Sequence, residues 1–297
     1  MTTSRPTAFL LAALALAATA ASAHAQPDHP THYVALGSSY AAGPGLAPTI
    51  DIGCARSGND YPHRLAQALR LDLVDATCSG ATTADVLHRA QRVPTHATVP
   101  PQIQAVTPDT DLVTVTIGGN DLGLIGGMIA DSCPAIVAGA PALHDPVSAA
   151  CKRALGHQKQ STAADFTAVR QAMADIVDRI HDIAPSATVL LVEYLPALSP
   201  DAATCSSVPL TAPDARTARH TWEGLIAATR AAARDAGAGS IAIPDADAHT
   251  ACSPEPWVGG FHNPVTTGPL SMASSYHPTE AGMAAVATEL EHRIQND

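Results

Sequence analysis

Short apolar runs alternate with stretches of helical period along most of the chain. Five apolar runs, each bounded by turn residues, are typical of buried strands: 34–37, 71–76, 112–117, 188–192 and 240–243. Five stretches carry apolar residues at the spacing of helices: 61–69, 83–89, 165–183, 214–236 and 279–294. Strands that alternate with helices indicate parallel βαβ crossovers. The pattern therefore predicts an α/β fold, a three-layer α/β/α sandwich around a five-stranded parallel sheet.

Five stretches without a clear period interrupt this alternation: 41–58, 92–109, 121–160, 196–213 and 245–276. They contain five of the six cysteines and much of the proline and glycine. No internal repeat or low-complexity linker divides the chain, so we expect a single domain over 26–297. In sheets of this kind function gathers where loops leave the carboxyl ends of strands.

The first 25 residues have the pattern of a secretory signal peptide. Arg5 precedes an apolar run from Ala8 to Ala18, and small residues then lead to two overlapping cleavage sites, after Ala23 or Ala25. An ordinary N-terminal helix is the alternative. No later segment reaches ~18 uninterrupted apolar residues, the length of a membrane span. We therefore expect a secreted protein that has a signal peptide over 1–25 and no integral membrane segment.

Composition narrows the possible partners. The chain is 46% hydrophobic and 14% charged, which is too apolar for a disordered chain. Acidic residues number 27 against 16 basic ones, a net charge of −11, and the basic residues form no cluster. A nucleic-acid partner is therefore not expected. We also expect a monomer that needs no cofactor.

The six cysteines are an even number, and in an oxidising compartment they pair by default. Six cysteines allow 15 connectivities, among which sequence alone does not choose. Their positions nevertheless form three local groups, and sequential pairing would join Cys54 to Cys78, Cys133 to Cys151, and Cys205 to Cys252. The alternative is a zinc site, for which only two pairs have ligand spacing: His29 with His32, and His249 with Cys252. Because the first pair lies near the new N-terminus and the second uses a paired cysteine, no metal is expected.

Four short motifs place polar groups beside strands or just before a helix. Ser39 follows the first predicted strand, Gly80 the second and Asn120 the third, while His277 precedes the last helix. Taken alone, each of these residues could have a purely structural role, as a helix N-cap, a turn residue or a surface histidine. Together, they could supply a nucleophile, oxyanion donors and a base from separate loops.

In this order the four motifs resemble the marks of the SGNH (GDSL-type) hydrolase superfamily, most closely its secreted actinobacterial lipases and esterases. The match spans 33–281. The resemblance implies a flavodoxin-like fold and hydrolysis of carboxylic esters through an acyl-enzyme on Ser39, with His277 as the base. It also implies an oxyanion hole formed by the backbone N–H groups of Ser39 and Gly80 and the side-chain amide of Asn120.

The chain departs from the family pattern at two positions. Ser38 stands where the family has the aspartate of Gly-Asp-Ser, and Ser274 stands where the triad acid usually precedes the histidine by three residues. A serine hydroxyl cannot supply the negative charge that stabilises an imidazolium. The resemblance implies that the backbone carbonyl of Ser274 orients His277 instead. A carboxylate from Asp245 or Asp247 is the competing possibility.

The substrate is the least determined part of the prediction. The stretches 121–160 and 245–276 hold apolar residues that could line an acyl channel, although buried loop packing explains them equally well. We expect a small-molecule or lipid ester. The alternatives are a phospholipase or carbohydrate O-deacetylase on the same site, or a non-catalytic binding protein that retains the fold.

Overall fold

Five parallel strands form the central sheet of the computed structural model, which describes residues 1–2, 31–156, 160–268 and 271–296. In sheet order the strands are β4 (Asp72–Asp75), β1 (His32–Gly37), β7 (Leu112–Thr116), β8 (Thr188–Val192) and β9 (Gly239–Ile241). Each neighbouring pair is parallel. The predicted α/β fold with a five-stranded parallel sheet is confirmed, with strand ends shifted by at most a few residues.

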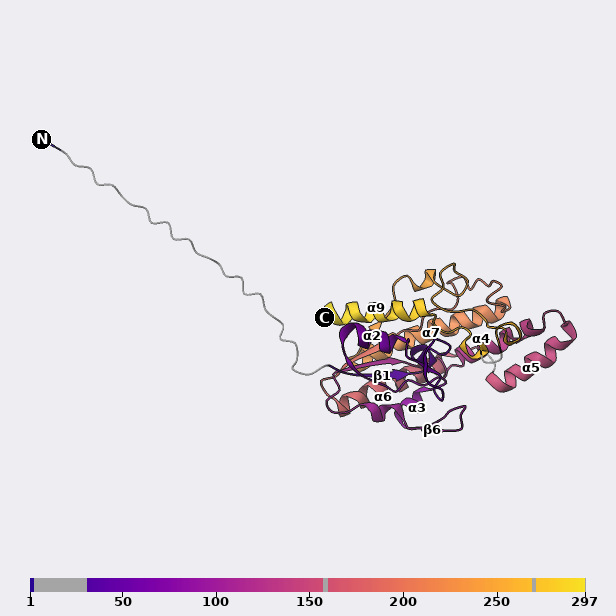
Figure 1. Cartoon of the computed structure of the whole chain (residues 1–297), viewed down its shortest axis with the longest axis horizontal. Helices are drawn as coiled ribbons and strands as arrows, with labels where there is room; N and C mark the ends of the chain where they lie inside the picture. The colour runs from indigo at the N-terminus through magenta and orange to yellow at the C-terminus, as the bar shows by residue number, and fades with distance from the viewer. Residues whose placement is uncertain (3–30, 157–159, 269–270, 297) are drawn as a thin grey trace.

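Helices cover both faces of this sheet. Figure 1 shows α2 and α9 along one side and α3 and α6 along the other. The main helices are α2 (Tyr61–Leu69), α3 (Thr83–Leu87), α6 (Ala163–Ile183), α7 (Ala212–Ala236) and α9 (Glu280–Asn296). Because helices bury both faces, every residue of β7 is buried, whereas the edge strand β4 alternates between exposed and half-buried positions.

Local sequence signals set the ends of the long helices. Thr162 and Asp165 form a capping box at the start of α6, in which each side chain binds the other residue's backbone N–H. Thr211 caps α7 by accepting a hydrogen bond from the N–H of Asp214. Gly237 ends α7 with a φ of 71°, a left-handed conformation that glycine adopts without strain. These ends agree with the prediction to within two residues.

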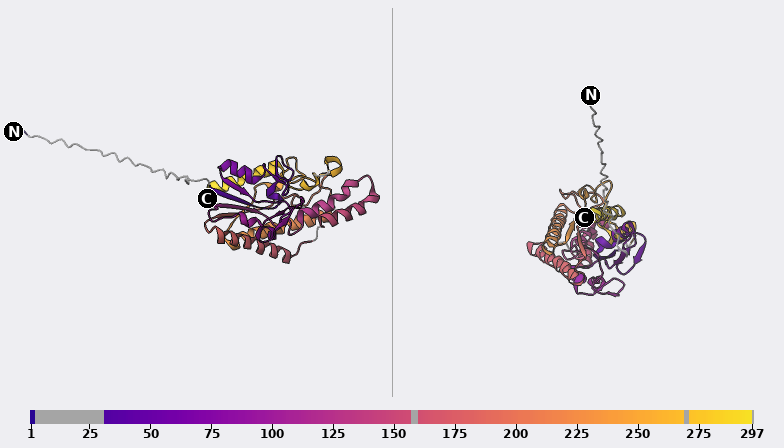
Figure 2. Two further views of the ribbon diagram at one scale, coloured as in Figure 1. Left: turned by 60° about the horizontal axis from the view of Figure 1, so that its bottom comes forward. Right: turned by 90° about the vertical axis from the view of Figure 1, so that its left-hand side faces the viewer.

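The stretch 121–160 contains two helices that its pattern does not predict. They are α4 (Leu124–Ser132) and α5 (His144–Leu155), with short 3₁₀ turns between them. Figures 1 and 2 show α5 extending beyond the end of the sheet. Seven of the nine residues of α4 are buried, so this helix has no polar face and its sequence shows no clear 3.6-residue period.

Three disulfides join the loops, in the sequential order that the cysteine positions suggest: Cys54–Cys78, Cys133–Cys151 and Cys205–Cys252. The first disulfide connects Cys54, in the segment between β2 (Thr49–Asp51) and β3 (Arg56–Ser57), to Cys78, which lies just after β4. The second connects the 3₁₀ turn directly after α4 to α5, and the third joins the loops after β8 and β9.

The remaining described elements are short: α1 (Ser39–Ala42), β2 (Thr49–Asp51), β3 (Arg56–Ser57), β5 (Gln91–Arg92), β6 (Thr98–Val99) and α8 (Pro264–Thr267), with further 3₁₀ turns at Gln102–Ala105, Ala246–Ala248 and Ser271–Ser274. Within the described ranges, no helix has the length and hydropathy needed to cross a membrane. The signal peptide predicted over 1–25 lies almost entirely outside the described residues.

Candidate active site

The predicted nucleophile lies at the carboxyl end of β1, in the sharp turn from strand to helix. Gly37 ends β1 with a φ of 145°, and a Cβ at this position would lie 2.5 Å from the carbonyl oxygen of Thr116 on β7. Only glycine fits there. Ser39 is the first residue of α1, so its N–H belongs to the first helical turn, where backbone N–H groups have no intrahelical acceptor.

The loop before α9 brings His277 onto this serine. Nε2 of His277 lies 2.7 Å from Oγ of Ser39, although 238 residues separate the two in sequence. Both residues are buried, at 6% and 7% exposure. The structure thus brings together the two residues that the sequence assigns as base and nucleophile.

Burial holds His277 in its neutral form. The pKa of His277 is lowered to about 4, chiefly by burial and slightly by the nearby His262, although the carbonyl groups of Ser275 and Ser274 favour the protonated ring. Nδ1 of His277 lies 2.9 Å from the carbonyl oxygen of Ser275. Because a carbonyl only accepts hydrogen bonds, Nδ1 carries the proton and Nε2 is free to accept the Ser39 hydroxyl proton.

The backbone group hydrogen-bonded to the imidazole belongs to Ser275, one residue after the position inferred from the family pattern. The carbonyl of Ser274 is close enough to act on the pKa of His277, while its hydroxyl binds the carbonyl of Ser271. Asp245 and Asp247, the alternative partners for His277, lie in an exposed loop. Asp247 forms an ion pair there with Arg219 at 2.9 Å.

The two other predicted oxyanion donors come from adjacent loops that are hydrogen-bonded to each other. Nδ2 of Asn120 donates to the carbonyl of Ala81 at 2.8 Å, which places the amide beside Gly80. This nitrogen carries a second hydrogen that the Ala81 bond does not use. Gly80 has a φ of 84° and is exposed, so its backbone is open to a ligand. Asp121 accepts a 2.6 Å hydrogen bond from the Thr83 hydroxyl and fixes the same two loops.

Ser38, the residue that replaces the family's aspartate, is fully buried and binds a tyrosine. Its Oγ lies 2.6 Å from the hydroxyl of Tyr194, which follows β8. Gly119 lies against the same side chain, since a Cβ at Gly119 would be 2.9 Å from the Tyr194 hydroxyl. One phenol group therefore connects the residue before the nucleophile to the residue before Asn120.

A second tyrosine links the nucleophile loop to the histidine loop. Tyr40 stacks on Tyr194 with ring centroids 4.2 Å apart, and its hydroxyl donates to the carbonyl of Tyr276 at 2.7 Å. Tyr276 has a φ of 57°, a strained conformation for a bulky residue. Its own hydroxyl is held by Ser132 of α4 at 2.6 Å. Contacts on both sides thus fix the backbone directly before His277.

A narrow apolar cavity adjoins this tyrosine network. Its volume is about 10 Å³, and it is lined by Tyr40, Leu124, Ile125, Met128, Ala197, Leu198, Ala218, Arg219 and Trp222. Leu124, Ile125 and Met128 belong to α4, which begins just after Asn120.

Elsewhere in the described part of the chain, Asp60, His63 and Asp75 offer donor atoms for a metal ion.

The sequence did not point to the residues that support the nucleophile and the base. Tyr194 follows a predicted buried strand, so its place at the carboxyl end of the sheet was a usable signal. The contacts of Tyr40 and Tyr276 depend on how distant loops meet, and no spacing in the sequence indicates them.

The chain is similar in sequence and in fold to known lipases and esterases. The model of the GDSL-like Lipase/Acylhydrolase family matches residues 35–285. Lipase 2 of Streptomyces coelicolor is 36% identical over 251 residues, which cover 80% of each chain. An esterase of Streptomyces scabiei is 33% identical over 208 residues, covering 63% of this chain and 59% of the esterase.

Two solved structures share the fold over most of their length. Phospholipase A1 from Streptomyces albidoflavus superimposes with a TM-score of 0.63 at 26% identity, covering 89% of this chain and 99% of the other. An extracellular lipase from Streptomyces rimosus gives a TM-score of 0.62 at 27% identity, covering 88% and 99%. The chain therefore belongs to the GDSL-like lipase/acylhydrolase family, as a lipase or esterase of the SGNH type.

Proposed function

We propose that this protein is a secreted serine esterase that hydrolyses neutral carboxylic esters through an acyl-enzyme on Ser39. The observation that carries the proposal is the 2.7 Å contact between Ser39 Oγ and Nε2 of a buried, neutral His277. A general base must lie within hydrogen-bond reach of the proton it removes, and this pair meets that condition.

In the acylation step, Nε2 of His277 takes the proton of Ser39 as Oγ bonds to the ester carbonyl carbon. The carbonyl oxygen becomes an oxyanion, which the N–H groups of Ser39 and Gly80 and the amide of Asn120 would bind. When the bond to the alkoxy group breaks, His277 returns the proton to the departing alcohol. The acyl group stays on Ser39.

Deacylation repeats these steps with water. Nε2 of His277 accepts a proton from the water, whose oxygen attacks the acyl carbon, and then gives the proton to Ser39 as the carboxylic acid leaves. The carbonyl at Nδ1 orients the ring and its tautomer but adds no negative charge. We therefore expect lower turnover than a carboxylate-assisted triad would give.

An acyl group that entered the apolar cavity beside Tyr40 would find little room, so we expect a preference for short acyl groups. The cavity volume of about 10 Å³ leaves room for about one water molecule. A longer acyl chain must displace side chains such as Met128, whose flexible thioether can move. A phospholipid substrate is the second candidate, because the structural relative from S. albidoflavus is a phospholipase A1.

Secretion rests on three observations. The N-terminal 25 residues have the pattern of a signal peptide. Three disulfides join the loops, which is typical of exported proteins, and the similar S. rimosus lipase is extracellular. Mass spectrometry of the culture medium should find a mature chain that begins at His24 or Gln26. Retention of the full-length chain in the cells would refute the proposed secretion.

Fluorophosphonate labelling tests the nucleophile. Wild-type protein should be labelled on Ser39, while Ser39→Ala and His277→Ala should not react. Ser253→Ala, with a serine in the loop joined by Cys205–Cys252, is the matched control and should label as wild type does. Equal labelling of wild type and Ser39→Ala would refute the assignment.

Ester hydrolysis then tests the substrate. Activity on p-nitrophenyl esters should be highest for acetate and butyrate and fall toward palmitate. Phosphatidylcholine vesicles serve as the competing substrate. Higher kcat/KM on the vesicles than on butyrate would favour the phospholipase, and labelling without any ester hydrolysis would contradict the esterase.

A further inference from the structure

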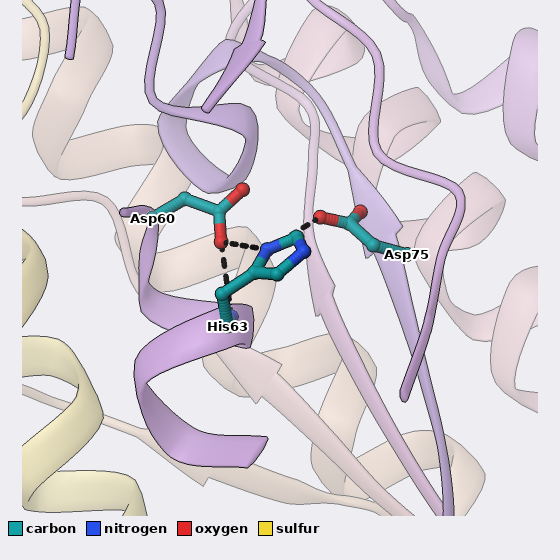
Figure 3. A group of neighbouring side chains, drawn as sticks. All are labelled: Asp60, His63 and Asp75. Carbon is teal, nitrogen blue, oxygen red and sulfur yellow. Dashed lines mark hydrogen bonds and ion pairs between the residues drawn. The ribbon is translucent and has the colours of Figure 1, made fainter. Parts of the chain in front are cut away.

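Two aspartates and a histidine meet between α2 and the edge strand β4 (Figure 3). Asp60 is the N-cap of α2, His63 lies in the first turn of that helix, and Asp75 ends β4. Nδ1 of His63 is 2.7 Å from Oδ1 of Asp60 and 3.5 Å from Oδ2 of Asp75. One donor atom from each residue lies within 4.8 Å of the other two.

Neighbouring groups hold the carboxylates in place and leave oxygen atoms unused. Oδ1 of Asp75 accepts the N–H of Thr77 at 2.8 Å, and Oδ1 of Asp60 accepts the N–H of His63 at 3.0 Å. Oδ2 of each aspartate is buried and has no hydrogen-bond partner among the described residues. The side chains are 0% and 5% exposed, and the unpartnered oxygen of Asp75 is the one that faces His63. Buried polar atoms without a partner are uncommon in folded proteins.

The charges around the cluster do not balance. Arg56 contacts both Asp51, at 3.1 Å, and Asp75, at 3.6 Å. With Asp60 included, three ionised carboxylates face one guanidinium group, so the net charge is −1 with His63 protonated and −2 once that proton has left. A single divalent cation supplies the missing charge.

The cluster lies beside a cavity and includes one partly exposed side chain. Asp75 and Arg56 line a cavity of about 400 Å³ that runs beside the 3₁₀ turn at Gln102–Ala105. The side chain of His63 is 30% exposed. Neither Asp60 nor His63 lines that cavity, so water would complete the coordination shell of a metal through the exposed side of His63.

We propose that Asp60, His63 and Asp75 form a binding site for a divalent transition metal, with zinc as the best fit. One imidazole nitrogen and two carboxylate oxygens are a donor set that zinc accepts, whereas calcium prefers oxygen ligands alone. The metal takes the place of the proton between Nδ1 of His63 and Oδ1 of Asp60, so binding releases that proton.

The position of the site indicates a stabilising role. Asp60 packs against Gly43, which ends α1, the helix of Ser39: a Cβ at Gly43 would lie 3.2 Å from Cβ of Asp60. A metal would fasten the start of α2 to the sheet edge beneath that helix. The inference concerns folding stability and does not depend on the proposed esterase reaction.

Calorimetric titration of chelator-treated protein with zinc chloride tests the site, with melting curves recorded alongside. Wild type should bind one zinc per chain, release a proton and melt at a higher temperature. His63→Gln and Asp75→Asn should each weaken binding by more than about 10-fold, a loss already typical of outer-shell changes. His292→Gln, at an exposed histidine of α9, is the matched control and should bind zinc as wild type does.

Two variants keep the test informative if one fails to fold, which circular dichroism would reveal. Zinc binding that is absent in wild type, or unchanged in a folded His63→Gln or Asp75→Asn, would overturn the proposal. So would tighter binding of calcium than of zinc. The cluster would then be a proton-bridged ion cluster, in which protonated His63 and Arg56 together offset two of the three carboxylates.

Discussion

The dependence of activity on acid pH tests the protonation state of His277 directly, because only the neutral imidazole can accept the serine proton. Burial lowers the pKa of this histidine to about 4 from an ordinary value of 6.5. At pH 5.5 about 97% of such a histidine is neutral, against about 10% of one with the ordinary pKa. We therefore expect kcat/KM to stay nearly constant from pH 7 to 5.5 and to halve near pH 4.

The same shift in pKa makes the fold sensitive to acid. Since the folded pKa of His277 is depressed, the unfolded chain binds more protons below pH 6.5. The free energy of unfolding should therefore fall as the pH drops from 6.5 to about 4. The pKa difference corresponds to a loss of about 3 kcal/mol.

The assay must separate titration of the base from acid unfolding. Hydrolysis of p-nitrophenyl butyrate is stopped at timed points by alkaline quench, which makes the released product visible at every pH. Circular dichroism at each pH and full recovery of activity on return to pH 7 identify the range in which the protein is folded. A midpoint near pH 6.5 in that range would show that burial does not depress the pKa, and the reasoning would be refuted.

Three further predictions concern the groups around the site. Asn120→Ala removes an oxyanion donor and should lower kcat about 100- to 1,000-fold with little change in KM; a loss below about 10-fold in steady-state kinetics would contradict that role. Tyr194→Phe leaves the Ser38 hydroxyl without its buried hydrogen-bond partner, so the free energy of unfolding in urea should fall by about 1–3 kcal/mol. The variant should also lower kcat more than it changes KM; unchanged kinetics would show that the Tyr194 hydroxyl does not help to position the nucleophile. Replacing Cys133 and Cys151 together with serine opens a loop of sequence separation 18 and should cost about 3 kcal/mol; limited proteolysis should then cut first within that loop, and cleavage elsewhere would disagree.

The central sheet is predictable because its sequence signals are local. The run at 112–117 is almost entirely β-branched and ends at two glycines, and it forms the fully buried β7. The helix α4 escapes prediction because its surroundings are apolar on nearly all sides, which removes the period that sequence analysis relies on. Tertiary burial, rather than local preference, makes that segment a helix.

The candidate site likewise has some residues whose positions follow from the sequence and others whose positions do not. Ser39, Gly80 and Asn120 follow strands, and His277 precedes a helix, so their places in the fold follow from the strand pattern. The group at Nδ1 of His277 does not, because the choice between the Ser274 and Ser275 carbonyls depends on the left-handed turn at Tyr276. The cluster of Asp60, His63 and Asp75 also escapes sequence reasoning, because its spacing matches no common ligand motif.

The nucleophile and its base touch in the folded protein but are 238 residues apart in the sequence. A ribosome that has made the sheet through β9 has already made Ser39, the cysteines of the first two disulfides and both oxyanion loops, but neither Cys252 nor His277. During synthesis, the growing chain therefore holds a serine that nothing can deprotonate. Hydrolytic capacity would arise only in the final moments of folding, when α9 docks beside α2 and the histidine closes over the serine.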